Sequence, residues 1–413
     1  MGANARADGR FAAIAARASR AAARVPAIAA LLPAIVALLP ALAAAQPAGE
    51  LDATLNESVV MIPKKAVIGT VELQTTLFRP PGDGPFPLVV INHGKSPGDP
   101  KFQSRARYPV AAREFVARGY AVAVPMRQGF AGSQGYYIGS GCNVGGNGEA
   151  QADDVRAVLD WLVRQPWIDA TAIVVIGQSH GGWTTLAFGA KPAPGVRALV
   201  NFAGGLRQES CVAWEDGLVR AAADYGARSR LPSLWFYGDN DSYFRPEVFR
   251  AMHEAYAKAG GPAKLVAFGA WPHGDAHGMF ASRAGRALWL PELEALLAQV
   301  GLPVRVVAPV ASPAHAAPVP RASGFAPADD PQALPGASAA ARAGFSKYLE
   351  GEPPKAFALS PRGAWAWVSR NPNAMALAIE RCNGHAREPA CRLYAVDEAV
   401  VWTGGDSPAR PRE

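Results

Sequence analysis

The clearest chemical motif in the sequence is GQSHG at residues 177–181, a GxSxG pattern. It directly follows a run of strand-forming residues and directly precedes a helical pattern. A turn from strand to helix forces the central residue into a strained conformation, and the flanking glycines remove Cβ atoms that would clash there. We expect Ser179 Oγ to stand free as a nucleophile, with the N–H of His180 pointing at the reacting carbonyl group as an oxyanion donor.

A serine hydroxyl needs a base, and that base needs a carboxylate to orient it. After an elbow of this kind the expected chain order is serine, acid, histidine. Asp239 and Asp241 follow one predicted strand, and His273 and His277 follow the last one. Both loops leave the carboxyl ends of parallel strands, where open α/β sheets gather their active sites. The residues alone leave open which member of each pair acts.

The elements that must position these residues form an α/β pattern. Six runs rich in Val and Ile predict strands buried on both faces, at 87–92, 120–125, 172–177, 197–202, 232–238 and 263–269. Apolar residues at helical spacing predict helices between them, at 103–118, 149–164, 182–190, 246–259 and 280–297. Two earlier segments, 58–63 and 71–79, alternate as antiparallel edge strands do. The pattern predicts a mostly parallel sheet with helices on both faces.

Over residues 59–297 these motifs resemble the α/β-hydrolase superfamily, within it the dienelactone-hydrolase-like and prolyl-oligopeptidase-like branches. The resemblance implies that fold. In these relatives the acid follows a strand as Gly-x-x-Asp, which maps onto Asp241, and the base precedes Gly and a large apolar residue, which maps onto His277. Asp239 and His273 are then loop-shaping neighbours. Dienelactone hydrolases proper use a cysteine nucleophile, and Ser179 departs from that pattern, so the namesake substrate does not carry over.

The resemblance also implies a second oxyanion donor, since residues 92–95 match the family's His-Gly segment. The candidates are the N–H groups of Lys95 and Gly94, with His93 bracing the loop. No metal or organic cofactor is implied.

A turn that begins at Arg127 resembles the Arg-Gly-x-Gly-x-Ser turn of these hydrolases. It implies a pocket wall in which Arg127, Phe130 and Tyr136 contact the substrate. An equally weighted alternative pairs Arg127 with the aspartates of the helix expected at 149–164. The stretch 204–230 is either a small lid or scaffold.

The composition excludes several protein classes. The chain has 413 residues, of which 50% are hydrophobic and 18% charged, so it is neither a disordered tail nor a coiled coil. Its net charge of +7 is concentrated at the start, where residues 1–45 hold five arginines against one aspartate. The remaining excess is scattered, which argues against a nucleic-acid partner.

The basic start runs into an uncharged apolar segment, 25–45, that ends in three alanines. This pattern predicts a secretory signal peptide over 1–45, cleaved after Ala45. A retained membrane anchor is the alternative, disfavoured because prolines interrupt the segment. We therefore expect an exported protein, periplasmic or secreted, without stable membrane insertion after cleavage.

Four cysteines fit an oxidising compartment. The simplest connectivity joins Cys142 to Cys211 and Cys382 to Cys391. None of them has the spacing of a metal site.

The chain divides into five predicted segments. These are the signal peptide over 1–45, an α/β-hydrolase domain over 46–301, a Pro/Ala-rich linker over 302–342, a small α+β module over 343–403 and a disordered tail over 404–413.

Three functions fit this sequence. The first is a serine hydrolase that cleaves a small-molecule carboxylic ester through Ser179, His277 and Asp241. The second is a prolyl-type peptidase built from the same residues, disfavoured because no propeller precedes the core. The third is a catalytically inert envelope-binding protein, with Trp365 and Trp367 as a glycan platform.

Overall fold

The computed structural model describes residues 51–66, 68–139, 141–311, 314–386 and 391–403. The predicted signal peptide and C-terminal tail lie outside the described residues. Within the described ranges, no helix has both the length and the apolar character needed to cross a membrane.

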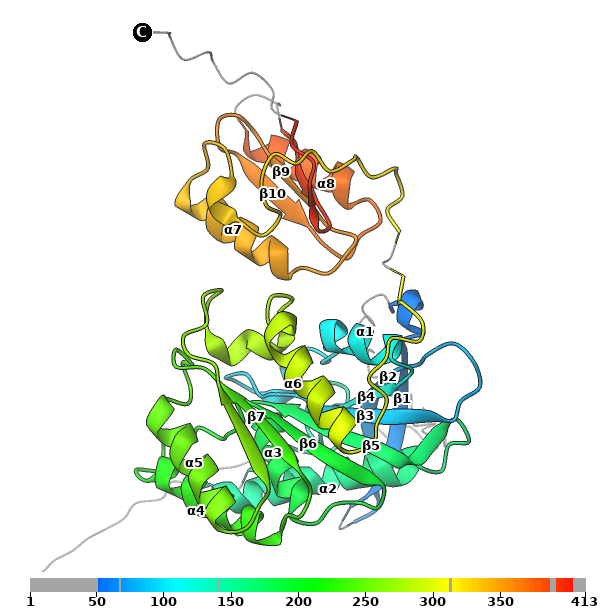
Figure 1. The fold of residues 1–413 in the computed structure, drawn as a ribbon, viewed down its shortest axis with the longest axis vertical. Coiled ribbons are helices and arrows are strands. Elements are labelled where there is room, and N and C mark those ends of the chain that lie inside the picture. The colour runs from blue at the N-terminus through cyan, green and yellow to red at the C-terminus, as the bar shows by residue number, and fades with distance from the viewer. Residues whose placement is uncertain (1–50, 67, 140, 312–313, 387–390, 404–413) are drawn as a thin grey trace, which may run out of the picture. The chain divides into compact units, whose positions relative to one another are not determined.

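The central element is an eight-stranded sheet with the order β1-β2-β4-β3-β5-β6-β7-β8 (Figure 1). Its strands are β1 (Ser58–Lys65), β2 (Thr70–Phe78), β3 (Phe86–Asn92), β4 (Ala121–Pro125), β5 (Ile168–Gln178), β6 (Val196–Phe202), β7 (Ser233–Tyr237) and β8 (Ala263–Ala267). The pairs β1–β2 and β2–β4 are antiparallel, and all other neighbours are parallel. The predicted mostly parallel sheet is confirmed, with two antiparallel pairings near one edge.

Helices cover both faces of this sheet (Figure 1). On one face lie α2 (Val144–Leu162), α3 (His180–Gly189), α4 (Trp214–Arg228) and α5 (Pro246–Lys258); on the other lie α1 (Pro109–Ala117) and α6 (Arg286–Gln299). The runs in β3, β4, β5, β6 and β7 are largely buried, because helices pack on both faces of these strands. The predicted burial of the run 263–269 was wrong: β8 is an edge strand, and its residues are half-buried or exposed. Three short 3-10 turns add η1 (Ala53–Leu55), η2 (Pro100–Phe102) and η3 (Ala276–Ala281).

The first helix starts later than its sequence pattern predicts. The expected helix over 103–118 begins only at Pro109, after Tyr108 with φ 50°. Proline suits the first helical turn, because its missing N–H has no partner to lose there, and it disfavours helical backbone at the residue before it.

The carboxyl ends of the parallel strands meet at one edge of the sheet. In the pairing register, Asn92 of β3 lies beside Gly177 of β5, and Gly177 lies beside Asn201 of β6. At the far side, Tyr237 of β7 lies beside Ala267 of β8. The loops that follow β3, β5, β7 and β8 therefore leave the sheet together.

The C-terminal part has a separate antiparallel sheet with the order β10-β9-β11-β12. Its strands are β9 (Ala356–Leu359), β10 (Trp365–Val368), β11 (Arg392–Val396) and β12 (Ala399–Val400), and η4 (Pro331–Ala333), α7 (Ala339–Glu350) and α8 (Ala374–His385) accompany them. The helix α7 starts inside the segment predicted as a linker. Its first turn is capped by Ser338, whose side chain accepts from the N–H of Ala341.

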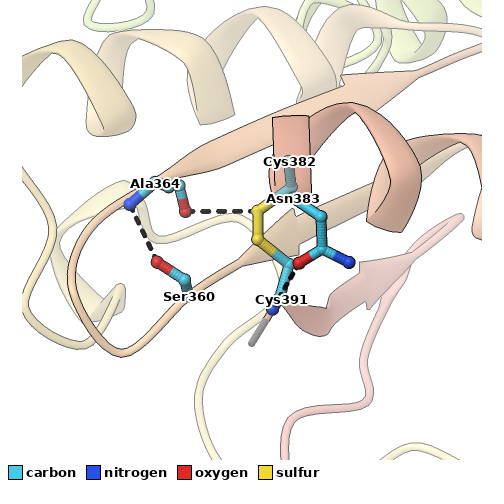
Figure 2. Close-up of a disulfide and its surroundings, with 5 residues drawn as sticks. All are labelled: Ser360, Ala364, Cys382, Asn383 and Cys391. Atoms are coloured by element: carbon cyan, nitrogen blue, oxygen red, sulfur yellow. Dashed lines mark hydrogen bonds between the residues drawn. A yellow bond between two sulfur atoms is a disulfide. The ribbon is translucent and has the colours of Figure 1, made fainter. Parts of the chain in front are cut away.

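Both predicted disulfides are present in the structure. Figure 2 shows the Cys382–Cys391 bridge, which ties the last turn of α8 to the start of β11. Beside it, the N–H of Cys391 donates to Asn383 Oδ1 at 3.0 Å. Buried residues on each face of this four-stranded sheet form two small cores, so the bridge closes a module with limited apolar burial.

Candidate active site

Ser179 occupies a sharp turn between β5 and α3. Its backbone angles are φ 56° and ψ −125°, a conformation that costs a non-glycine residue energy. The two motif glycines permit this turn. A Cβ at Gly177 would lie 2.0 Å from the Gly181 carbonyl oxygen, and one at Gly181 would lie 2.0 Å from the Asn92 carbonyl oxygen. This tight turn therefore places the Ser179 side chain at the sheet edge where the loops converge.

The structure joins one of the two histidines to one of the two aspartates. His277 Nδ1 lies 3.0 and 3.1 Å from the two carboxylate oxygens of Asp241. Asp241 Oδ1 also accepts from the N–H groups of Tyr243 at 2.8 Å and Phe244 at 3.0 Å. Since the carboxylate can only accept, Nδ1 carries the proton, which leaves Nε2 of His277 as the basic nitrogen.

The other histidine and aspartate lie elsewhere. Asp239 is exposed and faces Arg250 across 3.8 Å. His273 is exposed, and its ring packs against Trp271 with 4.8 Å between centroids. Among the described residues, neither side chain is hydrogen-bonded to Asp241 or His277.

Ser179 and His277 line a common cavity of about 520 Å³, here called the His277 cavity. Among the described residues, the ring of His277 is hydrogen-bonded to Asp241 and not to Ser179 Oγ. Catalytic hydrogen bonds of this kind are often long in ligand-free proteins and shorten when substrate binds. The arrangement brings Ser179 and His277 to one cavity, with Asp241 bonded to His277, in the chain order expected after a strand-to-helix elbow.

Backbone N–H groups flank Ser179 from two segments. Gly94 lies so close that an added Cβ would be 3.3 Å from Ser179 Cβ. Its own N–H donates to the Tyr108 hydroxyl at 3.3 Å. In the described part of the chain, the N–H groups of Lys95 and His180 have no protein acceptor, and His180 opens α3. These two are therefore the N–H groups free to bind an oxyanion.

A buried arginine connects these two segments. Arg127 donates from Nη1 to the His93 carbonyl at 2.7 Å, and its Nη2 lies 3.2 Å from His180 Nδ1. Its backbone N–H donates to His93 Nε2 at 3.1 Å. Because arginine only donates, both contacted imidazole nitrogens must be unprotonated. The remaining ring N–H of His93 faces Gly94 O at 2.6 Å, and that of His180 faces Asn147 Oδ1 at 2.7 Å.

The predicted pocket wall at Arg127, Phe130 and Tyr136 was wrong. Arg127 and Phe130 have no exposed surface, and Tyr136 is 87% exposed on the outside. None of the three lines the His277 cavity or the second cavity described below. Within the described residues Arg127 forms no ion pair with the aspartates of that helix: Asp154 pairs with Lys64, although its charge still opposes the lowering of the Arg127 pKa by burial. The guanidinium is instead buried in the domain, where it contacts His93 and His180 in the two segments beside Ser179.

Stability should fall in mild acid because of the two buried imidazoles. Burial lowers the pKa of His93 and His180 well below the ordinary value, and the Arg127 charge lowers each further. The unfolded chain therefore binds these protons first, and stability present above about pH 6.5 is lost as the pH falls below it, at about 1.4 kcal/mol per pH unit for each histidine. Urea unfolding at pH 6 and pH 5 measures this slope.

The His180→Gln variant should flatten that slope by about half, whereas the exposed His273→Gln variant should leave it unchanged. An unchanged slope in His180→Gln would contradict neutral burial of this imidazole.

Three positioning residues were missed by the sequence analysis. The Tyr108 hydroxyl donates to Gln178 Oε1 at 3.0 Å, and Gln178 Nε2 donates to the His277 carbonyl at 2.8 Å. Asp275 accepts from the N–H of His277 at 2.9 Å and from the Ser242 hydroxyl at 2.5 Å. Gln178 is an unspecified position of the GxSxG pattern, and an Asp two residues before a histidine is a weak signal, so only geometry reveals these roles.

A second cavity also reaches Ser179. It has a volume of about 590 Å³ and is here called the Arg207 cavity; its lining includes Lys95, Tyr137, Ser179, Arg207, Glu209 and Tyr243. Residues 205–209, from the stretch predicted as lid or scaffold, line it, whereas α4 in the same stretch packs in the core. The stretch therefore supplies both a cavity wall and scaffold. In the described ranges no group of three His, Cys, Asp or Glu side chains is placed to hold a metal ion.

The Cys142–Cys211 disulfide closes the loop that carries this wall, across a separation of 69 residues. Loop-closure entropy predicts that replacing both cysteines by serine lowers the free energy of unfolding by about 4 kcal/mol. The KM should rise as well, because Cys211 lies two residues from the cavity-lining Glu209. Urea unfolding and ester kinetics measure the two effects.

The matched control is the Cys382→Ser/Cys391→Ser pair, with a separation of nine residues. It should cost less stability, about 3 kcal/mol, and leave KM unchanged. An unchanged KM in the first variant would contradict a wall held by the disulfide.

Comparison with known sequences places this site in a family context. Residues 69–230 match the family model described as X-Pro dipeptidyl-peptidase (S15 family). This segment includes Ser179 and ends before Asp241. Cocaine esterase of Rhodococcus sp. (strain MB1 Bresler) is 30% identical over 144 residues, which are 34% of this chain and 22% of the esterase. The match thus spans under a quarter of that relative's length.

Solved structures with a similar fold carry several descriptions. A candidate dienelactone hydrolase from Klebsiella pneumoniae is 19% identical and covers 59% of this chain and 98% of its own, with a TM-score of 0.43. An esterase from Pyrococcus furiosus is 15% identical and covers 59% of this chain and 91% of its own, with a TM-score of 0.44. A puromycin-hydrolysing peptidase from Mycobacterium tuberculosis is 20% identical and covers 60% of this chain and 41% of its own, with a TM-score of 0.45.

Proposed function

We propose that this chain is a serine hydrolase of the α/β-hydrolase kind that acts on carboxylic esters, in keeping with its sheet, its strained serine turn and the family model matched by residues 69–230. One observation carries the proposal. His277, oriented by Asp241, shares a cavity with a serine that stands on a strained strand-to-helix turn. Activated serine nucleophiles require this combination of base, orienting acid and exposed hydroxyl.

The proposed reaction proceeds through an acyl-enzyme. Ser179 Oγ attacks the ester carbonyl carbon while His277 Nε2 takes the hydroxyl proton, and Asp241 stabilises the imidazolium. The N–H groups of His180 and Lys95 bind the oxyanion of the tetrahedral intermediate. His277 then gives its proton to the leaving alcohol. Water, deprotonated by the same imidazole, releases the acid and restores Ser179.

A prolyl-type peptidase is the second candidate, supported by the description of the matching family model. Such an activity would use the same Ser179, with an amide in place of the ester. Peptidases that bind a free amino terminus need a carboxylate for it. The carboxylate in the Arg207 cavity belongs to Glu209, which already pairs with Arg207. This pairing favours the ester substrate.

Substrate competition separates the two activities. The full chain should hydrolyse p-nitrophenyl butyrate with a higher kcat/KM than proline-containing p-nitroanilides. Faster turnover of the anilides would establish the peptidase instead. Turnover of neither, with no reaction of Ser179 toward a fluorophosphonate, would support the inert binding protein. In that third reading Trp365 and Trp367 would serve as a platform, although both are half-buried and pack in the small C-terminal core.

We also propose that the protein works in an oxidising compartment. Two disulfides join all four cysteines, which is typical of exported proteins. Expression of the full chain in its native setting should yield a secreted or periplasmic protein whose first residue is Gln46. A cytoplasmic protein that retains residues 1–45 would contradict export.

A further inference from the structure

The two cavities beside Ser179 have different relations to the base. Lys95, Ser179 and Tyr243 line both cavities, whereas His277 lines only the His277 cavity. The leaving alcohol must receive its proton from His277, so it has to lie on that side. The acyl part of the substrate then extends into the Arg207 cavity.

The Arg207 cavity contains one cation without a carboxylate partner. Arg207 and Glu209 form an ion pair with each other. The Arg207 guanidinium also donates to the Ser242 carbonyl. His180 is neutral, as its contact with Arg127 requires. Among the charged side chains that line this cavity, Lys95 alone has no carboxylate within ion-pair distance in the described residues.

The contacts of Lys95 are weak for a charged group. Its Nζ donates to the carbonyl oxygens of Ser96 and Gly98, both at 3.3 Å, and lies 5.8 Å from the centre of the Tyr137 ring. The side chain is half-buried. Burial lowers its pKa, against a smaller opposing effect of Asp99. A partly desolvated ammonium whose hydrogen bonds are long and go to neutral oxygens gains from an anion placed beside it.

We propose that the acyl part of the substrate carries a carboxylate that pairs with Lys95 Nζ, so that the enzyme prefers half-esters of dicarboxylic acids. The inference rests on the proposed serine esterase activity and specifies its substrate class. It uses the lysine side chain, whereas the oxyanion is bound by the backbone N–H of the same residue. The two contributions are therefore separable by comparing substrates.

A matched pair of substrates measures the preference. Mono-p-nitrophenyl adipate carries a free carboxylate, and methyl p-nitrophenyl adipate has the same chain with that charge removed. The wild-type enzyme should favour the monoanion by at least about tenfold in kcat/KM, which corresponds to about 1.4 kcal/mol. The preference should appear mainly in KM, since the ion pair exists in both the ground state and the transition state.

Substitution of Lys95 tests whether this side chain causes the preference for the monoanion. Lys95→Met should reduce the ratio of the two kcat/KM values to near one, and Lys95→Arg should keep most of it. The ratio of the two kcat/KM values is measured because any disturbance of the oxyanion site lowers kcat/KM for both esters alike. Lys101→Met is the control: it removes an equal charge from a neighbouring segment that lines neither cavity, and should leave the ratio unchanged.

The outcomes separate this inference from the proposed function. Equal hydrolysis of both esters by the wild type, or a ratio that survives Lys95→Met, would overturn the carboxylate subsite while leaving the esterase intact. Loss of the preference in Lys101→Met would also overturn the carboxylate subsite. The preference would then depend on the overall positive charge of the protein and not on Lys95. Failure to hydrolyse either ester, with Ser179 unreactive, would instead remove the proposed function itself.

Discussion

Replacing His277 by glutamine should lower kcat for p-nitrophenyl butyrate by up to about 10⁶, because the proposed base for the Ser179 proton is lost. His93, the other histidine that lines this cavity, has both ring nitrogens engaged by Gly94 and Arg127. Glutamine keeps a similar size and can still contact Asp241, so the change removes the basic nitrogen with little loss of packing. His277 lies under the Tyr243 ring at 4.4 Å between centroids, which a glutamine can partly preserve. The measurement is steady-state hydrolysis, with circular dichroism to confirm folding.

The matched control is His273→Gln, four residues away in the same loop. His273 is exposed and contacts Trp271 rather than Asp241, so its variant should keep kcat within about threefold of the wild type. Comparable losses in both variants would mean that the loop, and not the His277 imidazole, is required. A large loss in His273→Gln alone would reverse the assignment of the base.

Replacing Asp241 by asparagine should lower kcat by about 10⁴. In the wild-type protein His277 Nδ1 faces a carboxylate, which can only accept a hydrogen bond. The proton is therefore fixed on Nδ1, and Nε2 is left unprotonated. An asparagine amide can rotate to present its own N–H to Nδ1, which moves the proton to Nε2 and blocks the base. Asp241 is buried, and its two backbone N–H donors, from Tyr243 and Phe244, keep the side-chain oxygen in place.

The control for this change is Asp239→Asn. Asp239 is exposed, and its long pair with Arg250 is of the kind that contributes little to stability. That variant should hydrolyse the ester within about threefold of the wild-type rate. If Asp241→Asn retained full activity, the carboxylate would have no part in orienting the base.

Much of the fold could be predicted from the sequence because the strong local signals agree with the tertiary structure. Runs such as 87–92 and 172–177 are largely buried on both faces, so nearly every position is apolar and the strand is visible without a period-two pattern. The helix over 103–118 and the linker over 302–342 were less accurate. In the first, proline chemistry at Pro109 delays the start. In the second, Ala-rich composition conceals α7, whose Phe345 and Tyr348 pack in the C-terminal core.

The site could be predicted only as far as chain order and strand ends determine it. Those rules predicted that the loops carrying Ser179, Asp241 and His277 converge at one sheet edge. The choice between neighbouring candidates in each loop depends on side-chain direction, which spacing does not encode. Arg127 shows the limit most clearly: the resemblance of its turn to one in related hydrolases predicted a pocket wall, yet the side chain is fully buried between His93 and His180.

The most direct test of the account is covalent labelling of the full chain with a fluorophosphonate, followed by intact mass and peptide analysis. We expect one adduct per chain, on the peptide that contains Ser179, and none in Ser179→Ala. Labelling should also slow by several orders of magnitude in His277→Gln. An unlabelled wild-type protein, or an adduct that persists in Ser179→Ala, would contradict the central claim that this serine is the activated nucleophile.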